Sequence, residues 1–134
     1  MLHSYSIGSH IETLPDAIQV LVKRDLEAYC DIVGIPLDWD DVKRERLYNE
    51  LNLSDTMMDC GLREDRYEAI VNYYNQFGII PRLFYDIETD KYLTLNDLYD
   101  EFNKLYEYGE IETDSFADYL TNCTAQNGTL EEVR

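Results

Sequence analysis

The sequence predicts a mainly α fold (α+β), with about five to six short helices and one small β-hairpin near residues 79–95. Most apolar residues recur at three- and four-residue spacing in segments that end at glycine, as expected of amphipathic helices. Residues 79–85 instead form a short apolar run rich in β-formers, which is typical of a strand. A length of 134 residues predicts a single domain over 1–134.

The first third of the chain predicts a lead-in followed by one long helix. Residues 1–12 are polar and lack helical periodicity, so we expect either a short strand or a flexible arm. Apolar residues then fall at helical spacing over 14–33, where Pro15 suits the first turn and Gly34 suits the C-terminal stop.

Three further helices are expected before the hairpin. Asp40 is a plausible N-cap for a helix over 40–51. Ser54 caps a short third helix that Gly61 ends, and a fourth helix spans about 63–77 before Gly78.

The C-terminal half begins with the hairpin. A turn around 88–91 separates two extended segments, and Pro81 places the first at an edge or at its start. Thr94 or Asn96 caps a helix over 96–107, and a further helix covers 115–125. Thr129 is expected to cap a last helical turn over 130–133.

The charge balance is strongly acidic. The chain has 28 acidic and 11 basic side chains, a formal net charge of −17. DNA, RNA and anionic membranes would repel such a chain, so direct binding to them is excluded. The half from 83 to 134 carries 13 acidic and 3 basic side chains, and a cationic protein partner is the class of partner that this charge favours.

The densest acidic stretch supplies most of the candidate partner-binding residues. Lys91 and Lys104 are the basic residues within this stretch. Tyr99 and Tyr106 complete the candidate set, because tyrosine is favoured at protein interfaces. The acidic candidates are Asp86, Glu88, Asp90, Asp97, Asp100, Glu101, Glu107, Glu110, Glu112, Asp114 and Asp118.

Helix geometry arranges some of these acids in a column. Asp97, Asp100 and Glu101 lie three and four residues apart, which places their Cβ atoms about 5–6 Å from one another. That distance is comparable with the spacing of phosphates along a nucleic-acid strand, so such a column can imitate DNA before a basic groove. The alternative is that these acids form a solvated face that keeps the protein soluble.

Residues 86–97 also match much of a calcium-binding EF-hand loop, with oxygen-bearing side chains at five ligand positions. Lys91 replaces the glycine of the sharp turn, and Asp97 replaces the long bidentate glutamate. We therefore favour a hairpin and expect no metal and no cofactor. Motifs for nucleophilic, phosphate-binding or dinucleotide-binding chemistry are missing, so we expect no enzymatic activity.

Targeting signals are not evident. The first residues lack a basic and an apolar segment, and no apolar run reaches the length of a membrane span. Cys30, Cys60 and Cys123 are odd in number and widely spaced, which favours free thiols over disulfides. We expect a protein of the cytoplasm of a bacterial host cell.

The stretch Ser115-Phe-Ala-Asp-Tyr-Leu-Thr-Asn-Cys-Thr-Ala-Gln-Asn-Gly-Thr-Leu-Glu-Glu-Val133 resembles the tails of small proteins from phages and mobile elements of Gram-positive bacteria. The short, acidic, tyrosine-rich chain is similar in character to anti-CRISPR and anti-restriction proteins. The resemblance implies a non-catalytic DNA mimic that occupies the basic groove of a CRISPR effector nuclease or a restriction enzyme. The alternative is a phage or mobile-element adaptor, a protein–protein interaction module without mimicry.

Overall fold

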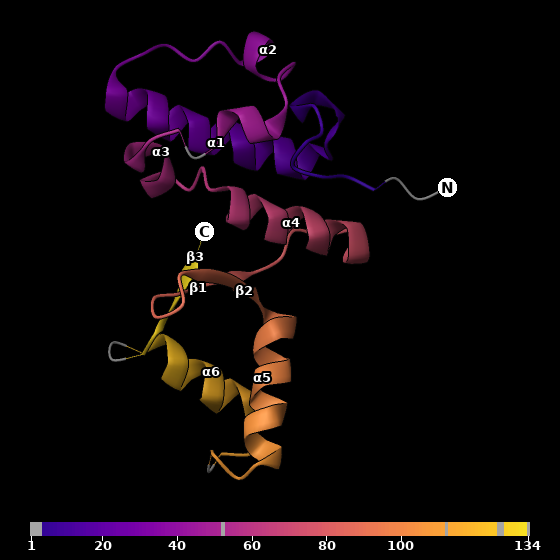
Figure 1. Cartoon of the computed structure of the whole chain (residues 1–134), viewed down its shortest axis with the longest axis vertical. Helices are drawn as coiled ribbons and strands as arrows, with labels where there is room; N and C mark the ends of the chain where they lie inside the picture. The colour runs from indigo at the N-terminus through magenta and orange to yellow at the C-terminus, as the bar shows by residue number, and fades with distance from the viewer. Residues whose placement is uncertain (1–3, 52, 112, 126–127, 134) are drawn as a thin grey trace. The chain divides into compact units, whose positions relative to one another are not determined.

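The computed structural model describes residues 4–51, 53–111, 113–125 and 128–133. It has the predicted fold class, mainly helical with a small antiparallel sheet. The chain forms two compact units, Met1–Ile80 and Pro81–Arg134. The α-helices and strands of both units are labelled in Figure 1.

The first unit is built on two long helices. Helix α1 spans Asp16–Val33 and helix α4 spans Glu64–Phe77, which confirms the predicted pair. Gly34 and Gly78 adopt the left-handed conformation at their C-terminal ends, and their N–H groups bond back to carbonyls of the last turn. The short helix α3, Asp55–Asp59, begins at Ser54, whose hydroxyl accepts from the Met57 N–H as predicted.

The predicted helix over 40–51 is wrong as a continuous element. The structure has a short helix α2 over Trp39–Val42, capped by Asp38 rather than Asp40, and a 3-10 helix η2 over Leu47–Glu50. Arg46 between them is extended and forms an isolated bridge with His10. Hydrogen bonds to a distant segment replace the helical ones here, which local periodicity cannot foresee.

That distant segment is the N-terminal lead-in. The N–H of Ile11 donates to the Glu45 carbonyl at 2.9 Å, and the N–H of Tyr48 donates to the Ile7 carbonyl at 2.8 Å. Ile11 opens a 3-10 helix, η1, over Ile11–Thr13 and is completely buried. Of the two forms expected for the lead-in, a short strand or a flexible arm, the flexible arm is wrong for its described part. The buried side chain of Ile11 and the paired backbone groups anchor it.

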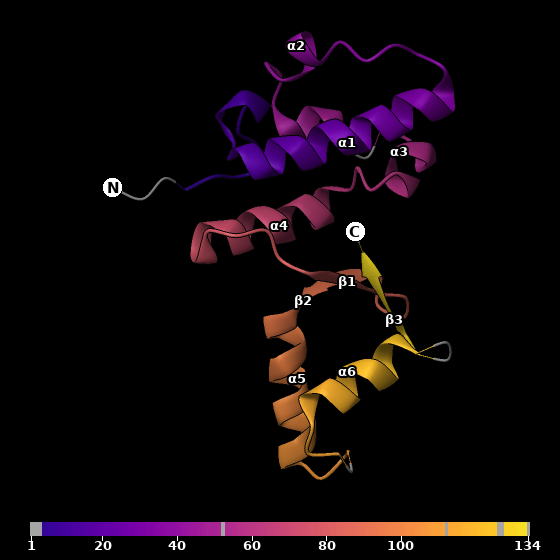
Figure 2. The same cartoon turned by 180° about the vertical axis from the view of Figure 1, so that it is seen from behind.

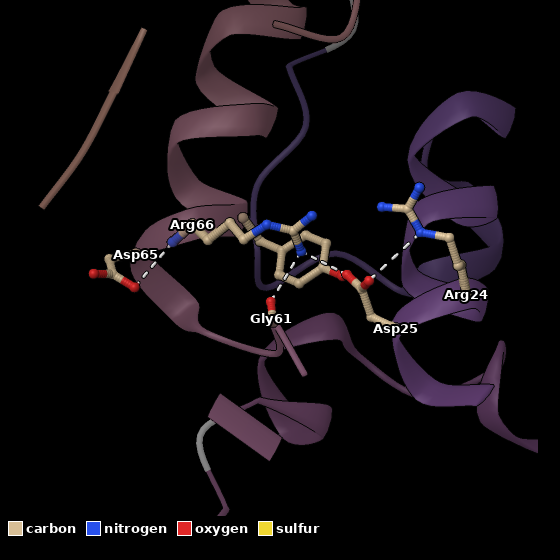
Figure 3. A network of polar contacts seen from close by, with 6 residues as sticks. Arg24, Asp25, Gly61, Asp65 and Arg66 are labelled. Carbon is tan, nitrogen blue, oxygen red and sulfur yellow. Dashed lines mark hydrogen bonds and ion pairs between the residues drawn. The ribbon is translucent and has the colours of Figure 1, made fainter. Parts of the chain in front are cut away.

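A network of buried polar side chains connects α1 and α4 in the core of the first unit (Figure 3). Arg66 of α4 donates from Nη1 to Asp25 of α1 at 2.5 Å and to the Gly61 carbonyl at 2.9 Å. The Tyr67 hydroxyl donates to the same Asp25 carboxylate. Burial and the Asp25 charge raise the pKa of Tyr67 well above its ordinary value, so the phenol stays protonated.

The second unit joins a three-stranded sheet to two helices. Strands β1, Leu83–Asp86, and β2, Lys91–Thr94, form the predicted hairpin, in which Tyr85 pairs with Tyr92. Residues 87–90 make the turn, and Asp90 has a positive φ of 54°. Helix α5, Leu95–Glu107, starts directly after β2, and helix α6, Phe116–Thr124, starts at the Ser115 cap.

The predicted last helical turn over 130–133 is wrong, because this segment is the strand β3, Leu130–Val133. It pairs antiparallel with β1 and gives the strand order β2-β1-β3. Leu130 packs with Phe84 and Leu98 in the core of the unit. The segment forms a strand because Leu130 is buried and because β1 has a free edge with which it can pair. These tertiary contacts outweigh the local signal for a helical turn.

Figure 2 shows the same elements from behind and makes the crossing of α5 and α6 easy to follow. Both helices contribute to the core that holds Phe84 of β1, through Leu95 and Leu98 of α5 and Leu120 of α6. Phe84 and Asp86 share one face of β1 because side chains alternate along a strand. Asp86 is thereby placed on the face of the sheet that the helices cover.

Candidate partner interface

The acidic candidates are displayed almost entirely on the surface of the second unit. Asp86 is half-buried, and Glu112 lies outside the described residues. The exposed members are Glu88, Asp90, Asp97, Asp100, Glu101, Glu107, Glu110, Asp114 and Asp118.

Three of the candidates come together at one pocket of about 410 Å³, which we name the acidic pocket. Asp86 reaches it from β1, and Asp97 and Glu101 reach it from the first turns of α5. The other residues that line the acidic pocket are Thr89, Lys91, Leu93, Leu98, Tyr119, Cys123, Thr129 and Leu130. Contacts between the hairpin and α5 thus join acids that lie up to 15 positions apart in the sequence.

The negative charges act on the polar groups of α6 in this pocket. Burial is the largest cause that raises the pKa of Tyr119 to about 12, followed by the neighbouring Cys123 thiol and the charges of Glu101 and Asp86. Burial also raises the pKa of the Cys123 thiol, and the charge of Asp86 adds to the effect. Both groups are therefore protonated at neutral pH and give the pocket two neutral hydrogen-bonding groups.

Some of the acids maintain the local structure. The Asp86 carboxylate accepts from the Glu88 N–H at 3.0 Å inside the hairpin turn. Asp97 completes a capping box, since its carboxylate accepts from the Thr94 N–H at 2.9 Å while the Thr94 hydroxyl accepts from the Asp97 N–H. The Tyr85 hydroxyl donates to Asp90. These three acids are therefore poor positions for a functional test.

A second group of acids takes no part in such local hydrogen bonds. Within the described residues, the side chains of this group form no hydrogen bond or ion pair with other side chains or with the backbone. We name this group the free acids, and its members are Asp100, Glu101, Glu107, Glu110, Asp114 and Asp118. They are exposed and available to an external cation.

The two candidate tyrosines lie on a different flank of α5. Tyr99 and Tyr106 are each about half exposed and have their rings 6.3 Å and 6.1 Å from that of Phe102. Phe116 of α6 lies 5.3 Å from Tyr99, measured between ring centroids. At 100° per residue, Tyr99 is turned about 160° from Glu101, so the tyrosines do not join the acidic pocket.

Part of the acidic pocket was not predicted from the sequence. Lys91, Tyr119 and Cys123 line it but were not among the candidates. The signal for Tyr119 and Cys123 is their four-residue spacing on α6, which places both on one face. What that face meets depends on the crossing of α6 with the hairpin, which the sequence alone does not specify.

The segment that resembles a calcium loop is the hairpin, as predicted. Its first and last positions, Asp86 and Asp97, are engaged by the turn and by the capping box. Within the part of the chain that the structure describes, no three His, Cys, Asp or Glu side chains gather as metal ligands.

Comparisons with protein-family models, with curated proteins and with solved structures gave no match. Among the described residues, no helix has both the length and the apolar character that a membrane span requires.

Proposed function

We propose that this protein is a non-catalytic inhibitor that imitates DNA and occupies the basic nucleic-acid-binding groove of a bacterial defence nuclease. The acidic surface of the second unit, formed by the acidic pocket and the free acids, would meet the Lys and Arg side chains that otherwise hold phosphates. For a CRISPR effector, the same surface would block recognition of the short duplex motif next to the target.

The observation that carries this proposal is the display of the free acids. A carboxylate that already accepts hydrogen bonds within the protein has fewer acceptor sites left for a partner. The free acids have no such contact within the described structure, and they lie on exposed positions of α5, α6 and the segment between them. Repulsion among them raises the free energy of the unbound state, and a cationic groove relieves it.

The spacing of the free acids on α5 also supports mimicry. Asp100 and Glu107 lie seven residues apart on the same face, about 10 Å along the helix axis. Glu101 stands beside Asp100 and turns toward the acidic pocket. A rigid helix therefore presents charges at fixed intervals, as a duplex backbone does, at little cost in conformational entropy.

An adaptor without mimicry is the second candidate. The half-exposed rings of Tyr99 and Tyr106, which lie on either side of Phe102 along α5, favour it because exposed aromatic side chains are typical anchors of protein interfaces. Under this alternative, the partner would contact the aromatic flank of α5 and would tolerate changes of the free acids.

The test is the triple variant Asp100→Lys, Glu101→Lys and Glu107→Lys. The wild-type chain should capture a basic nuclease from bacterial lysate and displace duplex DNA from it. The triple variant should lose both abilities, because its reversed charges repel the groove. Capture should also fall on the order of tenfold between 0.1 M and 0.5 M NaCl. Quantitative pull-down and a DNA-displacement assay measure these effects.

The matched control is Asp31→Lys, Asp59→Lys and Glu68→Lys in the first unit. These residues are exposed, and the control has the same net charge as the triple variant. The proposal requires the control to capture and inhibit like the wild type. Equal loss in both variants would mean that only total charge matters, and full activity of the triple variant would favour the adaptor.

A further inference from the structure

We propose a second docking surface, on the first unit, that takes an apolar anchor side chain from a cationic amphipathic segment of a partner protein. The surface is a pocket of about 390 Å³ between α1, the segment 35–38, α2 and α3, which we name the α1–α3 pocket. It shares no residue with the acidic surface of the second unit, so it stands independently of the proposed function.

The lining of the α1–α3 pocket is mostly apolar. Leu26 and Cys30 of α1 and Met57 of α3 are buried and form part of its wall. Ile35 and Leu53 are 51% and 70% exposed, so apolar surface is open to a partner. The remaining lining residues are Tyr29, Pro36, Leu37, Asp38, Asp41, Val42, Glu50 and Ser54.

The pocket is held open by local structure. Gly34 takes the left-handed conformation, and the N–H of Ile35 donates to the Cys30 carbonyl at 3.0 Å, so the chain turns sharply away from α1. Asp38 then caps α2 by accepting from the Asp41 N–H at 3.3 Å. Hydrogen bonds therefore hold both ends of the segment 35–38, which lines the pocket. A partner would bind a preformed surface.

The charge of the lining selects the partner. Asp38, Asp41 and Glu50 are acidic, and no Lys or Arg is among the residues that line the pocket in the described chain. Burial and the neighbouring charge of Glu45 raise the pKa of Glu50, so a cation placed beside this carboxylate would favour its ionised form. A Lys or Arg beside the apolar anchor would supply that cation, whereas a phosphate or an acidic peptide would be repelled.

The size of the pocket fits side chains rather than a large cofactor, because it lies at the small end of the range for ligand pockets, about 300–1,000 Å³. An amphipathic helix offers apolar residues at three- and four-residue spacing with basic residues beside them. One or two of its aliphatic side chains would enter the pocket, and its Lys or Arg side chains would face Asp38, Asp41 and Glu50.

The experiment titrates the full-length protein with a synthetic 14-residue peptide of Leu and Lys, with Leu at helical spacing. A scrambled isomer of the same composition is the control probe. Methyl NMR should show shifts at Leu26, Val42, Leu53 and Met57, and the scrambled isomer should bind at least about tenfold more weakly. Equal binding of the two peptides, shifts confined to the second unit, or no binding would overturn the proposal.

Two pairs of variants separate the apolar and the charged contributions. Leu53→Ser should weaken binding by about tenfold, while Val20→Ser, at an equally exposed residue outside the pocket, should not. Asp41→Asn should weaken binding more than Asp40→Asn, since Asp40 is adjacent but does not line the pocket. If either pair shows equal effects, the binding is not at this pocket.

Discussion

At the scale of single residues, the core of the first unit depends on a charged pair where the sequence pattern predicts apolar side chains. Asp25 lies three residues from Val22 on the buried stripe of α1, and Arg66 lies four residues from Ile70 on that of α4. Charges at stripe positions are the signal that could have identified the pair. Their connection to each other and to the Gly61 carbonyl required the fold, because the partners are up to 41 residues apart.

Gly61 gives a prediction at this scale. Its φ is +91°, and a Cβ there would lie 3.0 Å from Arg66 Nη1. Gly61→Ala should therefore lower the free energy of unfolding by more than the cost of a left-handed alanine, about 1–2 kcal/mol. Gly34→Ala is the matched control, since Gly34 has φ +75° and open space around its Cβ position. Urea unfolding measures both, and equal losses would contradict a role for Arg66.

At the scale of elements, local signals were sufficient wherever a helix has its own start and stop. Helices α1, α3, α4, α5 and α6 and the hairpin were predicted from caps, glycines and periodicity. The failures were the helix over 40–51 and the final turn over 130–133. In both, backbone groups pair with distant segments, His10 with Arg46 and β3 with β1. Such pairing depends on which edges are free in the folded protein, a property that local periodicity does not contain.

The capping box of α5 gives a prediction at the scale of elements. Thr94 is the last residue of β2 and the N-cap of α5, so its hydroxyl stabilises the junction that positions Asp97 and Glu101. Thr94→Ala should lower the free energy of unfolding by about 1 kcal/mol. Thr94→Ser keeps the hydroxyl and should lose less. Chemical denaturation compares the variants, and a serine variant as unstable as the alanine variant would show that the cap contributes little.

At the scale of the whole molecule, negative charge is distributed over both units. The first unit has 15 acidic and 7 basic side chains, and the second has 13 and 4. The two units therefore have similar net charges. The second unit differs because its acids occur in a shorter stretch of chain and because, in the described part of the chain, fewer of them are paired with Lys or Arg. Several acids of the first unit are paired with Lys or Arg, for example Asp40 with Lys43 and Glu27 with Lys23, whereas the free acids of the second unit have no such partner among the described residues.

A prediction follows from this excess of charge. Self-repulsion lowers the stability of a folded chain with a net charge of −17, and salt screens it. The melting temperature should therefore rise between 0.02 M and 0.5 M NaCl at pH 7, while capture of a basic partner falls over the same range. Differential scanning calorimetry measures the first effect. A melting temperature that falls with salt would mean that surface ion pairs outweigh the repulsion.

The sequence by itself determined the class of the fold, most helix boundaries, the hairpin and the acidic character of the C-terminal half. These are local or compositional properties, set by side-chain periodicity, caps and charge counts. The tertiary structure decided which acids remain free and which hold a turn or a cap, as Asp86 and Asp97 do. It also decided the third strand, the Asp25–Arg66 pair and both pockets. Each of these depends on contacts between residues far apart in the chain, and such contacts form only when the hydrophobic cores bring the elements together.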